Sequence, residues 1–155
     1  MKIITILLSC LILSYFSVQA AEKGFNYEDF IKQYFAAWKN TQKPKAAKED
    51  LEQYLTFLTD DIGYQHLPYS NDDSRQADGK TTLRKGMTYY LGIHTEYSAK
   101  LIKYSYGHNV IVLEFETSFK GVHPDNGQLI SSTSKVLEVL ELEEGKVSVI
   151  RHYSD

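Results

Sequence analysis

The second half of the sequence is patterned almost entirely as β-strand, whereas the first half is mainly patterned as helix. β-Branched and aromatic residues dominate the segments after Thr95, and turn residues such as Gly107-His108-Asn109 separate them. The predicted strands cover residues 98–106, 110–120, 128–142 and 147–153. Helical segments followed by a strand meander predict an α+β domain in which the helices cover one face of the sheet.

Three helices and one strand are predicted before this meander. The helices cover residues 27–39, 46–58 and 80–93, and the strand covers residues 62–67. Asn26 is placed to cap the first helix, and Pro68 ends the strand. Apolar residues recur every three or four positions of the first helix, which gives it one buried face.

The N-terminal segment has the pattern of a secretory signal peptide. A single charge, Lys2, precedes an apolar run over residues 3–16, and Ala20 is a small residue after which a signal peptidase would cut. The run is shorter than the roughly 20 residues that a membrane span needs. We therefore predict a signal peptide over residues 1–20, one domain over residues 21–155, and a secreted or periplasmic location without a membrane anchor.

Cysteine and charge exclude several classes of function. Cys10 is the only cysteine and lies in the predicted signal peptide, so the mature chain would have no disulfide, cysteine nucleophile or zinc–thiolate site. Lipid attachment at Cys10 is the alternative to simple cleavage, although the apolar run continues past this residue. The formal net charge is −3 and the basic residues do not cluster, which argues against a nucleic-acid partner.

Two predicted strands each carry a histidine and a tyrosine. Tyr64 and His66 precede Pro68, and His152 precedes Tyr153 on the last strand. Histidine titrates near neutral pH and is the usual general acid or base. If both strands lie in one curved sheet and both histidines face inward, Tyr64, His66 and His152 are candidate catalytic residues. The alternative is that neighbouring groups satisfy two partly buried histidines, without chemistry.

A carboxylate is a second candidate base. Glu114 would contact a ligand if it faced inward, where burial would raise its pKa. Strand alternation with Leu113 and Phe115 favours an outward Glu114 instead. Glu138 and Glu141, on the next strand, could likewise face either inward or outward.

Aromatic residues of the helices are candidate walls of a ligand site. Tyr34, Trp38 and Tyr90 lie on apolar helix faces and could line a cavity, although such a stripe also describes ordinary core. His94 continues the stripe of the third helix, but no second histidine stands at a metal-ligand spacing from it. We therefore predict no metal and no cofactor.

The order and spacing of these segments resemble the nuclear transport factor 2-like superfamily and, within it, the SnoaL-like domains. The matching features are the aromatic pair Phe35 and Trp38, residues 58–64, Gly79-Lys80 before the third helix, and the closing hairpin over residues 139–155. The resemblance spans nearly all of residues 21–155. It implies a cone-shaped α+β barrel, in which three helices pack on a highly curved antiparallel sheet with a pocket at its open end.

This superfamily includes isomerases, cyclases, dehydratases, epoxide hydrolases and non-catalytic binding or assembly domains, so the fold leaves the function open. Compared with limonene epoxide hydrolase, His66 stands in place of an asparagine and His152 falls near an aspartate. Glu114 and Glu116 fall where the hydrolase has an Arg-x-Asp pair, and the missing arginine argues against epoxide hydrolysis.

We expect a pocket domain for an apolar, carbonyl-bearing small molecule, and leave open whether it is an enzyme. A catalytic version would transfer a proton, as in an isomerase, cyclase or dehydratase. The alternative is a non-catalytic module that forms a homodimer or binds a partner through its open sheet face.

Overall fold

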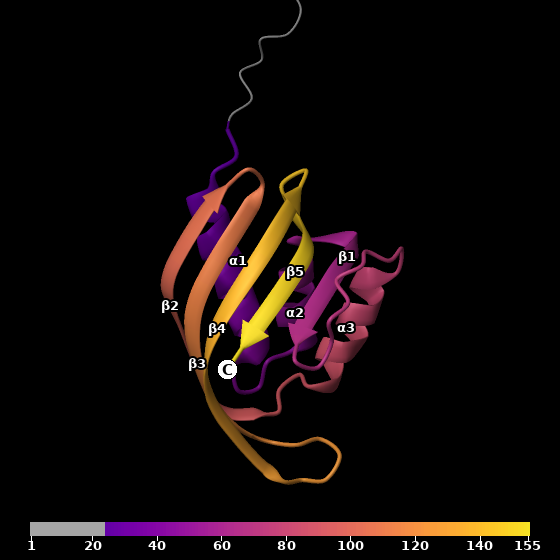
Figure 1. Ribbon diagram of the computed structural model, residues 1–155. Coiled ribbons are helices and arrows are strands. Elements are labelled where there is room, and N and C mark those ends of the chain that lie inside the picture. The colour runs from indigo at the N-terminus through magenta and orange to yellow at the C-terminus, as the bar shows by residue number, and fades with distance from the viewer. Residues whose placement is uncertain (1–23) are drawn as a thin grey trace, which may run out of the picture.

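Three helices lie against one face of a five-stranded sheet (Figure 1). The computed structural model describes residues 24–155, so the predicted signal peptide and Cys10 lie outside the described residues. The elements are α1 (Tyr27–Gln42), α2 (Lys48–Leu55), β1 (Leu58–Leu67), α3 (Gly79–Tyr89), β2 (His94–Gly107), β3 (Val110–Val122), β4 (Leu129–Glu143) and β5 (Lys146–Ser154). The predicted α+β class, with all helices in the N-terminal half, is confirmed. None of the helices within residues 24–155 combines the length and apolar character needed to cross a membrane.

The sheet is open and mixed, with the strand order β1-β5-β4-β3-β2. Strands β2 to β5 form the predicted antiparallel meander, whereas β1 joins the edge of β5 in parallel. The wholly antiparallel sheet expected from the resemblance is therefore modified at β1. This is possible because β1 and β5 are far apart in sequence, so no tight hairpin has to connect them.

Helix α1 is longer than predicted and provides most of the helical contribution to the core. Its N-cap is Asn26, whose side-chain oxygen accepts a hydrogen bond from the backbone N–H of Asp29 at 3.1 Å. Pro44 disfavours a helical backbone conformation only at the residue before it, and Lys43 is accordingly extended (φ −65°, ψ 157°). The helix can therefore continue as far as Gln42.

The end of α3 differs from the prediction and moves one histidine. The helix ends at Tyr89 rather than residue 93, and Gly92 adopts a φ of +75° in the turn that follows. His94 therefore begins β2 instead of continuing a helical stripe. Its Nδ1 atom lies 2.7 Å from the carbonyl oxygen of Gln42, which joins β2 to the end of α1.

The core lies between the helices and the inner face of the sheet. On β3, the inward residues Ile111, Leu113 and Phe115 are buried, and they alternate with more exposed residues of the outer face, Val112, Glu114 and Glu116. They pack in one cluster with Ile31 of α1 and Leu51 of α2. This clean alternation defines an inner face, which carries the candidate site, and a separate outer face.

Close contact between α3 and β1 requires a glycine at the start of the helix. A Cβ atom on Gly79 would lie 2.3 Å from the carbonyl oxygen of Ile62, whereas one on Gly86 would meet nothing within 4 Å. The structure therefore excludes a side chain at Gly79 but has room for one at Gly86.

We predict that Gly79→Ala lowers the free energy of unfolding by about 2 kcal/mol or more, because a backbone carbonyl cannot yield as a side chain can. In contrast, Gly86→Ala should raise it by about 0.5–1 kcal/mol, since alanine favours an exposed helix position. Urea unfolding followed by the fluorescence of Trp38, the only tryptophan, measures both changes. Equal effects of the two substitutions would contradict the close packing of α3 on β1.

Candidate functional site

The parallel pairing of β1 with β5 brings two histidines together. His66 is the register partner of His152, and their ring centroids are 4.5 Å apart at an interplanar angle of 71°. Tyr64 lies two residues earlier on β1 and therefore on the same face, and its hydroxyl is 3.4 Å from His66 Nδ1. The structure thus places all three candidate catalytic residues side by side.

A buried carboxylate holds the second histidine of this pair. Glu138 of β4 is the register partner of His152 and is 3% exposed. Its Oε2 atom lies 3.1 Å from His152 Nδ1, and its Oε1 atom accepts a hydrogen bond from the hydroxyl of Tyr34 at 3.0 Å. Both carboxylate oxygens therefore have a partner, as a buried acidic group requires.

Four tyrosines surround the Glu138 carboxylate. Burial raises the pKa of Tyr34, Tyr54, Tyr64 and Tyr97, and the charge of Glu138 raises each of them further. The hydroxyls of Tyr34 and Tyr54 also lie 3.2 Å apart. Because a raised pKa keeps a phenol protonated, these hydroxyls are neutral hydrogen-bond donors at physiological pH.

The first histidine is held in its neutral form. Burial lowers the pKa of His66 first, a positive charge on His152 lowers it further whenever that ring is protonated, and Glu138 partly opposes both effects. The exposed ring of Tyr69 lies beside His66, with ring centroids 5.3 Å apart. Tyr69 lies two residues after the end of β1 and marks the solvent side of the site.

The hydrogen-bond partners assign complementary roles to the two imidazoles. An ionised carboxylate can only accept, so His152 Nδ1 donates to Glu138 and the His152 Nε2 lone pair is left as a base. The Tyr64 hydroxyl and His66 Nδ1 lie 3.4 Å apart, and when the phenol donates in this contact, His66 carries its proton on Nε2 and can donate it. A proton acceptor and a proton donor thus lie next to each other. Within residues 24–155, no group of three or more His, Cys, Asp or Glu side chains could hold a metal ion.

Two of the four predicted ligand contacts lie near this site. The hydroxyl of Tyr34 binds Glu138, and Trp38 packs on Phe115 with ring centroids 4.9 Å apart. Phe115 in turn lies 6.4 Å from the ring of His152. Trp38 and Phe115 therefore connect the histidines to the packed aromatic core.

The other two predicted ligand contacts lie elsewhere. Glu114 faces outward from β3 and pairs with Lys103, so the structure does not place this predicted ligand contact at the inner-face site. The physical reason is strand alternation, since both neighbours of Glu114 face the core. Tyr90 is 52% exposed beyond the end of α3 and packs on Tyr89, so it does not line the histidine site either. Because α3 ends at Tyr89, Tyr90 does not continue the apolar face of this helix.

From the sequence, Glu138 was an open candidate that could face inward or outward, whereas Tyr54 and Tyr97 were not predicted for the site. A signal for Glu138 does exist in the sequence, because it alternates in phase with the buried residues Val136 and Leu140 of β4. A charged residue at a core-phase position of a strand indicates a buried polar interaction. Tyr54 has no comparable signal, since it occupies an ordinary apolar position of α2.

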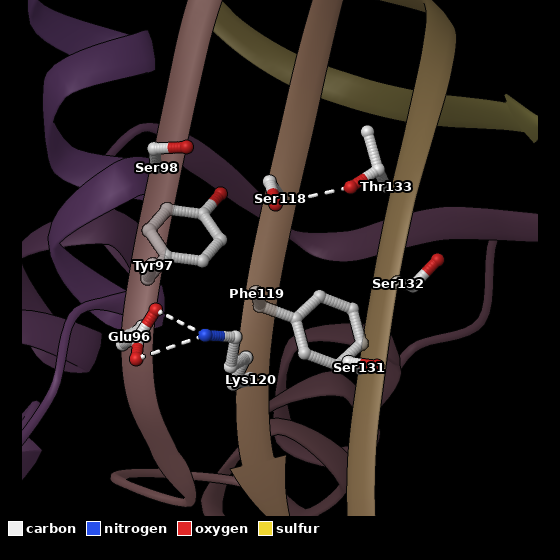
Figure 2. Close-up of a pocket in the computed structure, with 9 residues that line it drawn as sticks. All are labelled: Glu96, Tyr97, Ser98, Ser118, Phe119, Lys120, Ser131, Ser132 and Thr133. Carbon is white, nitrogen blue, oxygen red and sulfur yellow. Dashed lines mark hydrogen bonds and ion pairs between the residues drawn. The ribbon is translucent and has the colours of Figure 1, made fainter.

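A separate hollow of about 510 Å³ lies over the ends of β2, β3 and β4 (Figure 2). Figure 2 shows an ion pair between Glu96 and Lys120 and a hydrogen bond between Ser118 and Thr133, both on the outer face. Another hollow, of about 400 Å³, lies on the surface of α2. Neither hollow includes the histidine pair, whose two rings are partly buried among neighbouring side chains.

Comparisons with known proteins identify the fold. Neither a protein-family model nor a curated protein matches the sequence. A Shewanella putrefaciens protein that has been assigned as a SnoaL-like polyketide cyclase superposes with a TM-score of 0.63 at 14% identity, covering 83% of this chain and 88% of the other. An NTF2-like protein from Anabaena variabilis gives 0.61 at 19% identity, covering 89% and 96%. An LEH-like epoxide hydrolase from M. tuberculosis gives 0.58 at 16% identity, covering 82% and 80%.

The chain therefore has the α+β fold of nuclear transport factor 2-like proteins, including SnoaL-like domains, as the resemblance implied. At these identities the comparisons establish the architecture alone. The function has to be argued from the residues that this chain places in the site.

We predict that Tyr34→Phe lowers the free energy of unfolding by about 1–3 kcal/mol, because it leaves one oxygen of a buried carboxylate without its donor. Tyr106→Phe is the matched control, since this ring is 46% exposed and should give a change within about 0.5 kcal/mol. Urea unfolding at pH 7.5 measures both. Equal stability of the two variants would contradict the Tyr34–Glu138 bond.

The titration of His66 should respond to both neighbours with opposite signs. We predict by NMR that His66 titrates below the ordinary value of 6.5, that His152→Gln raises its pKa partway, and that Glu138→Gln lowers it further. Because the pKa is lower in the folded state, protonation favours the unfolded chain. The free energy of unfolding therefore falls as the pH drops from 6.5 through the lowered pKa. An unchanged His66 pKa in both variants would contradict the electrostatic coupling.

Proposed function

We propose that this protein binds an apolar, carbonyl-bearing small molecule and catalyses proton transfer beside the carbonyl, as an isomerase, cyclase or dehydratase does. The observation that carries the proposal is the Glu138–His152–His66 arrangement, with 3.1 Å between His152 Nδ1 and Glu138 Oε2 and 4.5 Å between the imidazole centroids.

The carboxylate makes His152 the stronger candidate for the base. Glu138 fixes the ring through Nδ1 and stabilises the imidazolium that forms when Nε2 takes a proton. A buried carboxylate is effective in this role because solvent does not screen its charge.

His66 is suited to stabilise the oxygen on which charge develops. A neutral imidazole with a protonated Nε2 can donate a hydrogen bond to a carbonyl oxygen that becomes an enolate. The lowered pKa of His66 keeps it neutral in the resting site, so it does not compete with His152 for a second positive charge. Tyr64, a candidate catalytic residue in the sequence, then serves to position His66.

The surroundings favour an apolar ligand over an anionic one. The ring of Phe115 lies next to His152, and the ring of Trp38 packs on Phe115. Within residues 24–155, the side chains in hydrogen-bonding contact with Glu138 are Tyr34 and His152. Since neither of these is a permanent cation, a second negative charge would be repelled.

The outer face of the sheet argues against a docking module as the leading function. Charged pairs occupy it, including Lys103 with Glu114 and Lys120 with Glu96. A broad apolar patch is the usual mark of a protein-docking face. The N-terminal pattern of a signal peptide supports a secreted or periplasmic setting for the proposed activity.

A model ketone tests the proposed proton transfer. We predict that the protein accelerates exchange of the α-protons of 2-tetralone in D2O, followed by ¹H NMR. His152→Gln should lower the protein-catalysed rate at least about 100-fold, as loss of a general base does. Glu138→Gln should cause a smaller loss, because the amide still accepts a hydrogen bond but no longer stabilises the imidazolium.

His108→Asn is the matched control for these variants. His108 is exposed in the β2–β3 turn at a φ of +51°, a conformation that asparagine tolerates well. This variant should retain the full exchange rate. Equal rates for His152→Gln and His108→Asn would overturn the assignment of His152 as the base.

A further inference from the structure

Strand β2 forms a free edge of the sheet. It is the last strand in the order β1-β5-β4-β3-β2, so its pairing with β3 uses only one side of its backbone. In Figure 1, the half of β2 that begins at His94 has β3 on one side and no helix or strand on the other. At the opposite edge, α3 packs closely on β1 through Gly79. Within residues 24–155, β2 therefore presents the edge whose free N–H and C=O groups can receive another strand.

The regular part of this edge is short. The register with β3 shifts between His94 and Glu96 and again between Leu101 and Lys103, so β2 is regular from Glu96 to Leu101. Such irregularities limit how far a sheet edge can pair with another strand. A partner strand can therefore extend the ladder over this stretch and not along the whole of β2.

Oppositely charged side chains stand on either side of Ser98 in this stretch. Glu96, Ser98 and Lys100 are all exposed and, because strand side chains alternate, all lie on the outer face. A second copy of the chain could pair antiparallel with this edge about a two-fold axis at Ser98. Glu96 of each chain would then lie opposite Lys100 of the other, and the two Ser98 side chains would face each other.

Other registers of this antiparallel pairing lack the charge complementarity. An axis at residue 96 puts Glu96 opposite Glu96, and an axis at residue 100 puts Lys100 opposite Lys100. Like charges directly opposite each other destabilise a strand pair. An axis at residue 97 or 99 leaves both charged residues opposite uncharged ones. The axis at Ser98 alone among these pairs opposite charges, and it does so twice.

Neighbouring strands extend the charge pattern on both sides of such a pair. Within one chain, Glu96 binds Lys120 of β3 at 3.0 Å. Lys100 lies opposite Glu116 of β3, which in turn lies opposite Lys135 of β4. Across two chains paired at Ser98, the outer-face row would therefore run Lys120, Glu96, Lys100, Glu116 and Lys135. The sign of the charge alternates at every strand of this row, including the step between the chains.

We propose that a second copy of this chain binds the free edge of β2, antiparallel and centred on Ser98, so that two sheets join into one continuous sheet in a homodimer. The two Glu96–Lys100 pairs set the register. Because α3 packs against the other edge, the pairing closes after two chains and does not propagate into a filament. The histidine site lies on β1, β4 and β5, so the inference does not rest on the proposed proton transfer.

Sedimentation velocity measures this association. A ladder of this length is a small interface, so we expect the purified protein to change from monomer to dimer between about 10 µM and about 1 mM. Glu96→Lys would place lysine opposite lysine twice in the dimer, and Lys100→Glu would place glutamate opposite glutamate twice. Each substitution should weaken dimerisation at least about tenfold. A protein that stays monomeric over the whole range would overturn the inference.

A mixture of the two variants tests the register itself. The new lysine at position 96 of one chain would lie opposite the new glutamate at position 100 of the other, and the native Lys100 would lie opposite the native Glu96. Both pairs again have opposite charges, so the mixture should dimerise with about the affinity of the unmodified protein. Recovery would also show that both variants are folded. Failure of the mixture to associate more tightly than either variant alone would contradict the pairing at Ser98.

Lys103→Glu and Glu114→Lys are the matched controls. They make the same two changes of charge on an ion pair that lies beyond the regular stretch. Each variant should dimerise as the unmodified protein does. A loss as large as that caused by Glu96→Lys would show that net charge, rather than the register at β2, governs association, and would overturn the inference.

Backbone hydrogen exchange distinguishes an edge pairing from a contact between sheet faces. In the proposed dimer, the N–H groups of β2 that point away from β3 gain hydrogen-bond partners, whereas a face-to-face contact leaves them free. Exchange at alternate amides over residues 96–100 should slow about threefold or more when the sample changes from monomer to dimer. Unchanged exchange at these amides in a dimeric sample would overturn the pairing through β2.

Discussion

The buried carboxylate of Glu138 is the interaction on which the arrangement of this domain depends. A charged group in the core is tolerated only when its oxygens are bonded, and here one oxygen is bound by Tyr34 of α1 and the other by His152 of β5. The same two bonds attach the longest helix to the centre of the sheet and fix the orientation of a histidine ring. Stability and the proposed chemistry therefore share one group, and Tyr34 serves both.

The parallel pairing of β1 with β5 supplies the second histidine. Because β1 is an edge strand, other contacts have to hold it in place. Helix α3 packs closely on its outer edge through Gly79. Two arginines anchor the loop that follows β1: Arg75 binds Asp61 and Glu143, and Arg151 binds Asp73 and Glu141. With β1 fixed in this way, His66 stays at 4.5 Å from His152, and the two imidazoles can act on one ligand.

Strand alternation explains most of what could be predicted about the site. It placed Tyr64 and His66 on one face, and it favoured an outward Glu114, which the structure confirms. Applied to β4, the same alternation puts Glu138 in phase with Val136 and Leu140, so its burial was open to prediction. Its partners were not, because Tyr34 lies 104 positions away along the chain. Tyr90 lies outside the site because α3 ends at Tyr89, whereas the apolar stripe in the sequence continues past that residue.

By itself, the sequence determined the class of the domain, the order of its elements and the residue types available for acid–base chemistry. These follow from local periodicity, capping and turn residues, which act over a few positions. Only the tertiary structure decided that β1 adds in parallel to β5, that His152 is paired with a buried carboxylate, and that β2 lies at the free edge of the sheet. Each of these depends on which strands become neighbours in space, and the packing of the whole core sets that pairing.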